Sequence, residues 1–417
     1  MRMNLIDYEE AVRLIYSSLP QNIGVQRVWL YDALNHILAE DIFAPFNMPE
    51  CRRLAMDGYI FSFSQIQEIL SHSQDEVFCF KVHATLAAQS DWEEFQEPVV
   101  LKAFTGARLP IWGDCLVLIE EIIRTQDEQI WISRKILENL KPLKHIREKG
   151  ENFSVGEILL QKGTHVQAAE IGLLASLNQL FVQVYQQPKI AILCGGNELV
   201  DIGESPSQSH FVRSINNHLL YSLVLQEGAI PLTYPLFKDD KKEALELLQQ
   251  ALQQADLILF SGGMSYGDFD LIPYLLESQA QKVYFYGVNM KPGKPTAYAT
   301  INDKPLLGLA GFPNATYMGF YLFARPIINA LKGSTSQNTT FYATLLQDFF
   351  KDDPRVEFRP AFIQLKDGQF YASLENKKHI HSAAINNLCG ENSGFVIAKK
   401  NHYKKGEQIE IIPNRQL

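Results

Sequence analysis

The 417-residue sequence lacks paired cysteines, long apolar runs and an excess of basic residues. Its five cysteines are scattered and include no Cys-x-x-Cys pair, which argues against a disulfide framework or a structural zinc site and favours a reducing compartment. No apolar run reaches the roughly 18 residues that a membrane span needs. The first ten residues carry Asp7, Glu9 and Glu10 where a signal peptide requires basic and then apolar residues. We therefore expect a cytoplasmic protein that crosses no membrane.

The charge balance excludes nucleic acid as the default partner. The chain has 38 basic and 47 acidic residues, which gives a net charge of -9. An anionic substrate would therefore have to bind in a local basic pocket. Hydrophobic residues make up 46% of the chain and charged residues 20%, which is typical of a well-packed globular protein whose length suggests roughly two to four domains.

In the first half of the chain, the apolar pattern changes from one typical of helices to one typical of strands, and then back to a helical pattern. Apolar residues recur at helical spacing in residues 8–15, in residues 30–38 and again in residues 167–178. Residues 46–146 contain short apolar runs that are typical of strands. We expect a helical and extended domain of residues 1–45 and 147–180, with a β-rich domain of residues 46–146 inserted between its two halves.

The second half predicts an α/β domain followed by a small barrel. Residues 181–333 alternate buried strands with helices, which indicates parallel βαβ units with ligands at the carboxyl ends of the strands. Residues 334–417 return to short strands and are expected to form a C-terminal β-barrel domain. The expected fold class is therefore multidomain α/β plus β.

Three polar loops follow predicted strands of the α/β domain: Gly195–Glu198, Ser261–Asp270 and Lys291–Pro295. Glycines let the backbone approach a ligand closely, and a following helix start favours an anion. Carboxylates in such loops suit Mg²⁺, and the two lysines with rigid prolines suit an oxyanion or phosphate. For any one loop, ordinary turn and capping roles explain the residues as well. Three such loops on one sheet edge favour a ligand pocket.

Several segments in a fixed order carry a family resemblance: Ala55–Tyr59, Thr105–Ala107, Arg147 with Gly150 and Glu151, Glu170–Ala175, Glu198 and Leu199, Ser261–Gly263 with Ser265, Gly267, Asp268 and Asp270, and Lys291–Pro295. With this pattern the chain resembles the molybdopterin molybdenumtransferase family, which includes bacterial MoeA proteins and the E domain of gephyrin. The resemblance covers nearly the whole length. The Ser-Gly-Gly and Lys-Pro-Gly-Lys-Pro segments are its most specific parts.

The resemblance implies a reaction and an assembly. Members of this family insert molybdate into the dithiolene of adenylylated molybdopterin and release AMP with the help of Mg²⁺. They are elongated homodimers of four-domain subunits whose active site lies between the α/β domain of one subunit and the first two domains of the other. Other proteins of molybdenum cofactor biosynthesis are further expected partners. Molybdate and tungstate are nearly the same in size and charge, so the sequence does not separate them.

The same resemblance implies roles for individual residues. The catalytic group would be Asp57, Glu198, Asp268, Lys291 and Lys294. The substrate-binding group would be Thr105, Arg147, Ser261, Gly262, Gly263, Ser265, Asp270, Pro292 and Pro295, of which Thr105 and Arg147, with Asp57, match the contribution of the second subunit. Mg²⁺ would be held by Glu198, Asp57 and Asp268.

The chain also departs from the family pattern. The departures are Leu54 for a usual Ser, Asn152 for Asp, Gly195 for Thr, Asn197 for Asp, and Ala310 and Phe312 for the Pro and Asn of a Leu-Pro-Gly-Asn-Pro segment. Asn is nearly the same shape as Asp but is a far weaker Mg²⁺ ligand and no base. An alternative interpretation is therefore a catalytically degenerate paralogue that binds pterin nucleotide, molybdate or a partner protein without turnover. A protein of the same fold with another nucleotide chemistry is the third interpretation.

Overall fold

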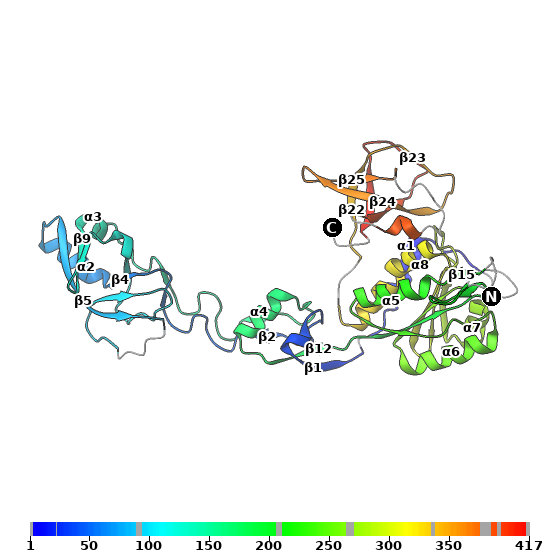
Figure 1. Cartoon of the computed structure of the whole chain (residues 1–417), viewed down its shortest axis with the longest axis horizontal. Coiled ribbons are helices and arrows are strands. Elements are labelled where there is room, and N and C mark those ends of the chain that lie inside the picture. Colours follow the sequence, from blue (N-terminus) through cyan, green and yellow to red (C-terminus); the bar gives the residue numbers. More distant parts are fainter. Residues whose placement is uncertain are drawn as a thin grey trace. The chain divides into compact units, whose positions relative to one another are not determined.

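The computed structural model describes residues 3–21, 23–88, 94–205, 211–263, 271–334, 338–375, 385–389 and 393–413. The chain divides into two compact units, residues 41–161 and residues 1–40 with 162–417 (Figure 1). All five cysteines are free thiols. Among the described residues, no helix has both the length and the apolar character that a membrane span requires.

The unit of residues 41–161 is built around a six-stranded sheet in the order β7-β4-β6-β5-β9-β8. Its strands are β4 (Gly58–Phe61), β5 (Val77–Leu86), β6 (Val100–Ala103), β7 (Cys115–Leu118), β8 (Arg124–Gln126) and β9 (Gln129–Ser133). Helices α2 (Phe63–His72) and α3 (Arg134–Glu138) pack through Ile66 and Leu137 onto this sheet. Two short antiparallel pairs complete the unit, β2 (Ile42–Phe43) with β11 (Ile158–Leu160) and β3 (Arg53–Leu54) with β10 (Ile146–Arg147). The β-rich texture expected for this region is confirmed.

The larger unit contains a small antiparallel pair, β1 (Val25–Trp29) with β12 (Phe181–Tyr185). Helix α4 (Ala168–Ser176) forms where the spacing predicts it, and its Glu170 side chain accepts a bond from the Gln167 backbone N–H at 2.9 Å. The helix expected in residues 30–38 is wrong, because only a 3-10 turn, η1 (Leu30–Ala33), forms there. Leu38 instead forms a bridge to Val184, so its burial comes from strand-like pairing and not from a helix face.

The centre of the larger unit is a six-stranded sheet in the order β16-β13-β17-β21-β20-β18. Its strands are β13 (Lys189–Cys194), β16 (Ile230–Thr233), β17 (Leu257–Ser261), β18 (Lys282–Tyr286), β20 (Ala297–Ile301) and β21 (Lys304–Leu309). Strands β16, β13, β17 and β21 run parallel, as the alternation of strands and helices predicts. Strand β20 is antiparallel to both of its neighbours and was not anticipated. Asn302 and Asp303, both at positive φ, form the two-residue turn that folds β20 onto β21.

Helices cover both faces of this sheet (Figure 1). Successive residues of β13 alternate between two cores, with Ile190 and Ile192 in one and Ala191 and Leu193 in the other. The first core takes α1 (Tyr8–Ser17), α5 (Asn216–Gln226), α8 (Pro313–Gly319), the π-helical segment η3 (Phe320–Ala324) and α9 (Arg325–Leu331). The second takes α6 (Lys241–Gln254) and α7 (Leu271–Gln279). Burial on both faces explains why these strands are continuous apolar runs.

The C-terminal residues form the expected barrel. Its five strands are β22 (Phe341–Leu345), β24 (Val356–Lys366), β25 (Gln369–Ser373), β26 (Ser393–Ala398) and β28 (Gln408–Pro413). The ring closes because β24 pairs with both β25 and β26. Strand β19 (Met290–Lys291) of the α/β part runs parallel to β24 and places Lys291 opposite Glu357. A short pair, β23 (Phe349–Phe350) with β27 (His402–Tyr403), and the 3-10 turn η4 (Ile385–Leu388) flank the barrel.

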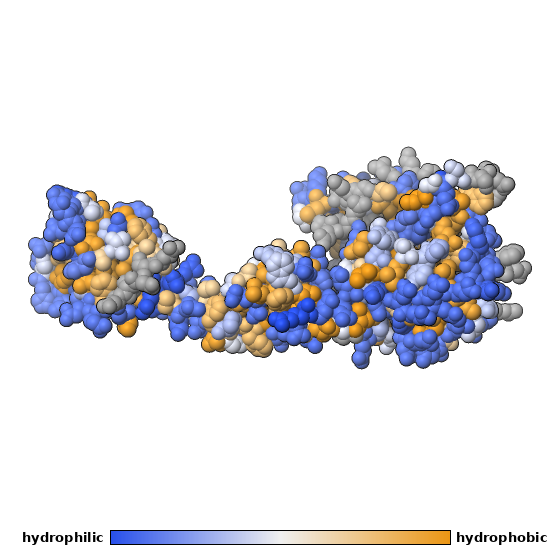
Figure 2. Space-filling view, turned by 60° about the horizontal axis from the view of Figure 1, so that its bottom comes forward, coloured by the Kyte–Doolittle hydropathy of each residue, from blue (hydrophilic) through white to orange (hydrophobic). Residues whose placement is uncertain are grey.

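Apolar side chains are exposed around the β1–β12 pair. They are Val25, Trp29, Tyr31, Leu34, Leu180 and Phe181. In Figure 2 apolar colour gathers over this part of the chain, whereas hydrophilic side chains dominate around α6. Trp29 and Phe181 lie opposite each other in the β1–β12 register, and exposed apolar side chains that gather in this way are typical of protein–protein contact.

Candidate active site

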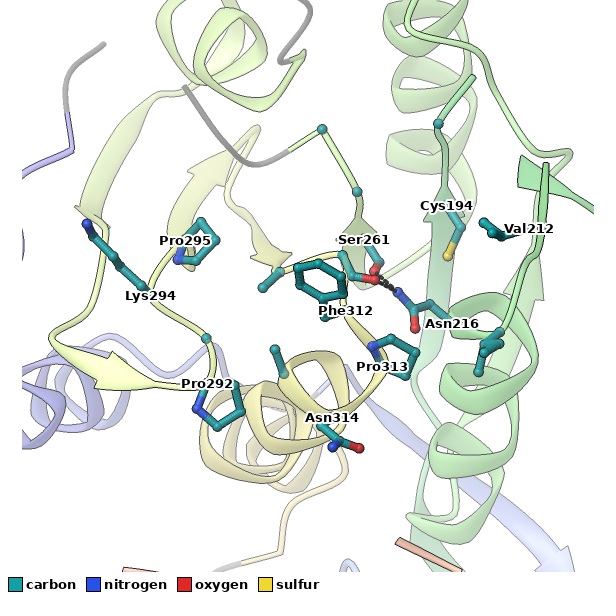
Figure 3. Close-up of a pocket in the computed structure, with 18 of the residues that line it drawn as sticks. Cys194, Val212, Asn216, Ser261, Pro292, Lys294, Pro295, Phe312, Pro313 and Asn314 are labelled. Carbon is teal, nitrogen blue, oxygen red and sulfur yellow. Dashed lines mark hydrogen bonds between the residues drawn. The ribbon is translucent and has the colours of Figure 1, made fainter. Parts of the chain in front are cut away.

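A cavity of about 780 Å³ lies at the carboxyl ends of the parallel strands in the larger unit (Figure 3). Its walls are the segments that follow β13, β17 and β21, together with the Lys291–Pro295 loop, the start of α5 and residues 355–360 of the barrel. Strand ends β13, β17 and β21 meet here because Cys194 pairs with Ser261 and Ser261 with Leu309. The predicted edge of the sheet is therefore the site of the pocket.

The Ser261–Gly263 segment forms the floor of this cavity and depends on glycine. The Gly195 backbone N–H donates to the Ser261 carbonyl at 3.2 Å, so the two loops touch through their backbones. Gly262 has φ +100°, and a Cβ there would lie closer than 3.0 Å to the Gly195 carbonyl oxygen. No other residue type fits this close approach without moving the loop.

Asn216, at the start of α5, ties two of these loops together. Its Nδ2 donates to the Ser261 hydroxyl at 2.8 Å and to the Gly311 carbonyl at 2.7 Å (Figure 3). Its Oδ1 is buried and has no partner among the described residues. An unpaired buried acceptor beside a cavity is suited to a donor on a ligand. Sequence reasoning missed Asn216, because a helix-initiating Asn is ordinary in sequence and only folding brings it to the pocket.

The Lys291–Pro295 loop lies against the barrel. The Thr296 hydroxyl donates to the Gly293 carbonyl at 2.7 Å, and the Val288 N–H donates to the Lys294 carbonyl at 2.9 Å, which fixes the loop. The Nζ of Lys291 lies 3.5 Å from Glu357 Oε2. Lys294 is exposed and makes no ion pair with any other residue that the structure describes. Pro292 and Pro295 line the cavity beside it, and their substrate-binding role stays a prediction.

The barrel adds two arginines to the pocket that sequence reasoning missed. Arg355 forms a two-point ion pair with Asp353 and donates to the Met290 carbonyl at 3.3 Å. Arg359 lies over the Phe349 ring at 4.8 Å, and its Nε is buried with no partner among the described residues. Burial lowers the pKa of the Arg359 guanidinium, and Glu357 partly offsets that shift. Together with the two lysines, they form a cationic wall suited to an oxyanion.

The acidic side of the cavity is arranged differently from the family pattern. Glu198 is exposed, and its carboxylate lies directly over Gly196. The Asn197 backbone N–H donates to Asp239 Oδ2 at 3.3 Å, and the Asp239 N–H donates back to Asn197 Oδ1 at 3.2 Å. Asp239 lines the cavity, so a carboxylate remains beside the neutral Asn197. An aspartate at position 197 would face a second carboxylate, which explains why Asn is suited to this position.

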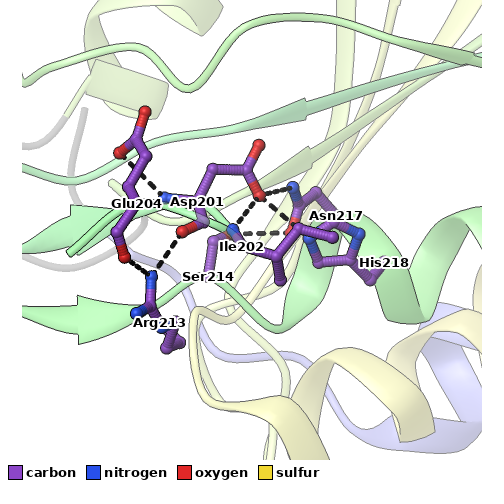
Figure 4. Close-up of polar contacts among 7 residues, drawn as sticks. All are labelled: Asp201, Ile202, Glu204, Arg213, Ser214, Asn217 and His218. Atoms are coloured by element: carbon purple, nitrogen blue, oxygen red, sulfur yellow. Dashed lines mark hydrogen bonds and ion pairs between the residues drawn. The ribbon is translucent and has the colours of Figure 1, made fainter.

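A network around Asp201 holds the wall that Leu199 and Val212 contribute (Figure 4). Strands β14 (Leu199–Val200) and β15 (Val212–Arg213) pair in parallel, and Arg213 Nη1 donates to the Asp201 carbonyl at 2.6 Å. Asp201 Oδ1 accepts from the Ile202 N–H at 2.8 Å and lies 2.9 Å from His218 Nε2. These hydrogen bonds hold the pKa of Asp201 below its usual value, and the bond from the Ile202 N–H contributes most to this shift. The network therefore positions the wall and keeps Asp201 ionised.

Asp57 and Thr105 meet in the other unit. Asp57 precedes β4 and Thr105 follows β6, and Gly58 pairs with Ala103 in this antiparallel register. Asp57 Oδ1 accepts from both the backbone N–H and the hydroxyl of Thr105, each at 2.7 Å. Arg147 is exposed on β10, opposite Arg53. The predicted Asp57 and Thr105 therefore form one group, whereas Arg147 belongs to a separate strand pair.

Three predicted residues, Ser265, Asp268 and Asp270, lie outside the described residues. Their assigned roles stay predictions.

Replacing Thr105 with valine is expected to raise the pKa of Asp57. The hydrogen bond from the Thr105 N–H lowers that pKa most, and the bond from the Thr105 hydroxyl is the second cause, because both stabilise the ionised carboxylate. Without the hydroxyl, Asp57 would lose its charge at a higher pH on acidification. A carbon-13 NMR titration of the Asp57 carboxyl would measure the shift, with Thr125→Val, an exposed position on β8, as the control. An unchanged Asp57 titration in Thr105→Val would contradict the assignment.

Two further departures from the family pattern have a structural basis. Leu54 is 1% exposed and packs in the core with Ile60 and Leu101, so the missing hydroxyl removes no group from the described pocket. Phe312 is 60% exposed and lies on the cavity wall, between the Ser261–Asn216 pair and the proline-containing loop (Figure 3). It offers an aromatic surface where the family has a polar side chain.

Replacing Gly195 with the usual threonine is expected to destabilise this protein. A Cβ at position 195 would lie closer than 3.0 Å to the ring of Phe237, which is itself buried and packs on Phe260 at 5.5 Å. Overpacking of this kind costs about 1–3 kcal/mol. Urea denaturation of Gly195→Thr would measure the loss, and Phe237→Leu in the same chain should recover part of it. A single variant as stable as the parent would contradict the packing argument.

Comparison with known proteins matches two long stretches of the chain to families that concern molybdopterin. The family described as "MoeA N-terminal region (domain I and II)" matches residues 6–178, and the "Probable molybdopterin binding domain" matches residues 191–330. A molybdopterin molybdenumtransferase of Bacillus subtilis is 28% identical over 414 residues, covering 99% of this chain and 94% of that protein. One from Staphylococcus epidermidis is 30% identical over 353 residues, covering 84% and 81%. The molybdopterin biosynthesis MoeA protein of Pyrococcus horikoshii has the same fold, with a TM-score of 0.79 at 24% identity, covering 98% of this chain and 99% of that one.

Proposed function

Because the chain belongs to the molybdopterin molybdenumtransferase family, a group of transferases in molybdenum cofactor biosynthesis, we propose that it inserts molybdate into adenylylated molybdopterin and releases AMP. The observation that carries this proposal is the cationic wall of the cavity. Lys291, Lys294, Arg355 and Arg359 line one side of a pocket whose floor is the Ser261–Gly263 loop. Molybdate is a tetrahedral dianion, and fixed cations with backbone N–H groups are its natural donors.

The cavity also suits the planar part of such a substrate. Phe312 and the prolines Pro292, Pro295 and Pro313 provide apolar surface beside the cations. Aromatic side chains stack on nucleobases and similar heterocycles at about 1–3 kcal/mol per ring. A pocket with an apolar wall, a cationic wall and a glycine floor supports binding of a pterin nucleotide together with an oxyanion.

Release of AMP requires cleavage of a phosphoanhydride, on which negative charge develops. Lys294 and the backbone N–H groups of the Ser261–Gly263 loop would stabilise that charge, and the lining of the cavity by Lys294 and this loop supports the assignment. The sulfurs of the pterin dithiolene would bind the inserted metal, so the reaction needs no cysteine from the protein. Cys194 lines the cavity, but burial raises the pKa of its thiol to about 12, which keeps it protonated and unreactive.

Mg²⁺ is part of the proposal, and the donor set fits it. Mg²⁺ is commonly bound by one or two carboxylates together with phosphate oxygens and water. Glu198 and Asp239 line the same cavity and would hold it, and it would neutralise charge on the phosphoanhydride. Within the described parts of the chain no group of three or more His, Cys, Asp or Glu forms a metal cage. Asp57 and Asp268 remain predicted Mg²⁺ ligands.

We further propose that the chain acts as a cytoplasmic homodimer, in which Asp57, Thr105 and Arg147 contact substrate. The exposed apolar face around Trp29 and Phe181 supports self-association. Other proteins of molybdenum cofactor biosynthesis remain predicted partners.

The decisive experiment measures AMP release by the purified full-length protein from adenylylated molybdopterin, with and without molybdate and with and without Mg²⁺. We expect release that requires both. A protein that releases no AMP under any of these conditions would contradict the proposal. Tungstate in place of molybdate shows whether the site separates the two oxyanions.

The degenerate paralogue is the second candidate, and the observation that favours it is Asn197 in place of a carboxylate. It predicts that the same preparation binds the pterin nucleotide without releasing AMP. Measuring the binding of the nucleotide beside AMP release therefore separates the two. Asp239, which contacts Asn197 and lines the cavity, favours the active enzyme, because it keeps a carboxylate at this place.

A further inference from the structure

One carboxylate lies inside the cationic wall of the cavity. Glu357, on β24, is 3% exposed and is paired across the β19–β24 register with Lys291. Its Oε2 lies 3.5 Å from the Lys291 Nζ. A buried carboxylate is strongly unfavourable unless cations compensate its charge. Its presence in a pocket suited to an anion therefore needs an explanation.

Other cations surround Glu357 from the barrel. The Lys351 side chain is buried and donates to the Asp353 carbonyl at 3.0 Å and the Arg355 carbonyl at 2.5 Å. Burial lowers the pKa values of Lys351 and Arg359, and in both cases Glu357 acts in the opposite direction. The Asp353 carboxylate is engaged by Arg355. Asp353 also acts electrostatically on Lys291 and Lys351, so it shares these cations with Glu357, and of the two carboxylates Glu357 is the one that lines the cavity.

A charge count of the cavity shows what Glu357 changes. The described lining residues include five cations, Arg213, Lys291, Lys294, Arg355 and Arg359, and three carboxylates, Glu198, Asp239 and Glu357. These lining side chains leave an excess of two positive charges, one of which, on Arg355, is offset by its ion pair with Asp353 behind the lining. Glu198 is exposed and Asp239 is half-buried, so solvent screens both of them more than it screens Glu357. Glu357 therefore has the largest effect per charge on an anion bound at the cationic wall.

We propose that Glu357 is a fixed counter-charge that weakens the binding of tetrahedral oxyanions at this wall and reduces the preference of the site for dianions over monoanions. The inference rests on the proposed function, because it assumes that the oxyanion binds beside Lys291. It assigns Glu357 a role in setting specificity through Lys291 and the arginines. Such a counter-charge would keep the oxyanion affinity low enough for the bound metal species to leave the wall.

The dependence on ligand charge distinguishes this role from a structural one. Coulomb energy is proportional to the charge of the ligand, so removing one fixed negative charge favours a dianion twice as much as a monoanion of the same shape. In fold-change, the gain for the dianion is the square of the gain for the monoanion. A mere change in packing would alter both affinities by a similar factor. A displacement of Lys291 would also act in proportion to ligand charge, so the variants that lack Lys291, described below, are needed to exclude it.

The test measures the binding of molybdate and of perrhenate, a tetrahedral monoanion, to the full-length protein and to Glu357→Gln by calorimetry. We expect Glu357→Gln to bind molybdate about tenfold more tightly and perrhenate about threefold more tightly. The control is Glu407→Gln, which makes the same change in net charge at an ion pair with Lys400 on the barrel surface, and which should leave both affinities unchanged. Weaker binding of both anions, or equal factors for the two, would overturn the proposal.

A second comparison keeps the test valid if Glu357→Gln folds poorly. Lys291→Gln and Lys291→Gln with Glu357→Gln differ only in the carboxylate, and the double variant leaves no buried charge of this pair unmatched. The molybdate-to-perrhenate affinity ratio should be about threefold higher in the double variant than in Lys291→Gln. An unchanged ratio would overturn the counter-charge role.

Failure of this inference differs from failure of the proposed function. If the parent protein binds no molybdate, or if Lys294→Ala leaves its molybdate affinity unchanged, the oxyanion does not use this wall, and both proposals fall. If the parent binds molybdate and loses it in Lys294→Ala while Glu357→Gln shows no charge dependence, only the counter-charge role is wrong.

Discussion

Replacing Lys294 with alanine is expected to lower molybdate-dependent AMP release about a hundredfold. Lys294 lines the cavity, is exposed, and makes no ion pair with another described residue, so its charge is available to the substrate. Removing one preorganised donor from the place where negative charge develops typically costs 10²- to 10³-fold in rate. The measurement is the rate of AMP release at saturating adenylylated molybdopterin and molybdate.

The matched control for this prediction is Lys189→Ala. Lys189 is an exposed lysine at the start of β13, so it lies at the opposite end of this strand from the cavity. The Lys189→Ala variant makes the same change in net charge as Lys294→Ala without touching the cavity. Its rate of AMP release should equal that of the parent. Equal rates in the parent and in Lys294→Ala would show that this lysine does not act on the reacting phosphate or oxyanion.

The second large effect is expected from Gly262→Ala. An alanine there would need φ near +100°, which strains an L-residue, and its Cβ would lie closer than 3.0 Å to the Gly195 carbonyl oxygen. Because the neighbouring atom is backbone, the loop itself must move. We expect the free energy of unfolding to fall by about 3 kcal/mol, with loss of AMP release even where the protein remains folded. Urea denaturation and the AMP assay measure the two effects.

Gly311→Ala is the comparison variant. Gly311 lies against the same loop, but a Cβ at 311 would be 3.5 Å from its nearest neighbour, the Gly262 Cα, and its φ is not in the left-handed region. A methyl group of the same size should therefore be tolerated there. If the two alanine variants were equally stable and active, the close approach of the Gly195 and Gly262 loops would not determine the shape of the pocket.

Most of the local structure was predictable from the sequence. The buried runs 189–194 and 257–261 are strands because both faces of the sheet are covered. The helix-favouring residues Ala, Leu, Glu and Gln mark α6. The predicted helix at 30–38 failed because Leu30 is buried by a 3-10 turn and Ile37 and Leu38 by isolated bridges, whereas Leu34 is exposed. Strand β20 was missed although Asn302 and Asp303 mark its turn.

The site was predictable only where it is local in sequence. The loop Ser261–Gly263 and the Lys291–Pro295 motif carry their chemistry in consecutive residues, and the parallel order of the strands brings them to one edge. Asn216, Asp239, Arg355, Arg359 and Glu357 were not predicted, because each reaches the cavity through a contact between distant segments. Nothing in their immediate sequence distinguishes them from capping or surface residues.

The departures from the family pattern also needed the tertiary structure. Leu54 is a core residue, Gly195 leaves room for Phe237, and Asn197 bonds Asp239, so these substitutions are matched by their neighbours. The sequence by itself determined the family, the βαβ order and the lysine and glycine loops, since these depend on residue type and short spacing. Only the tertiary structure decided which charges share the cavity, because β19 must pair with β24 before Lys291 meets Glu357 and the barrel arginines.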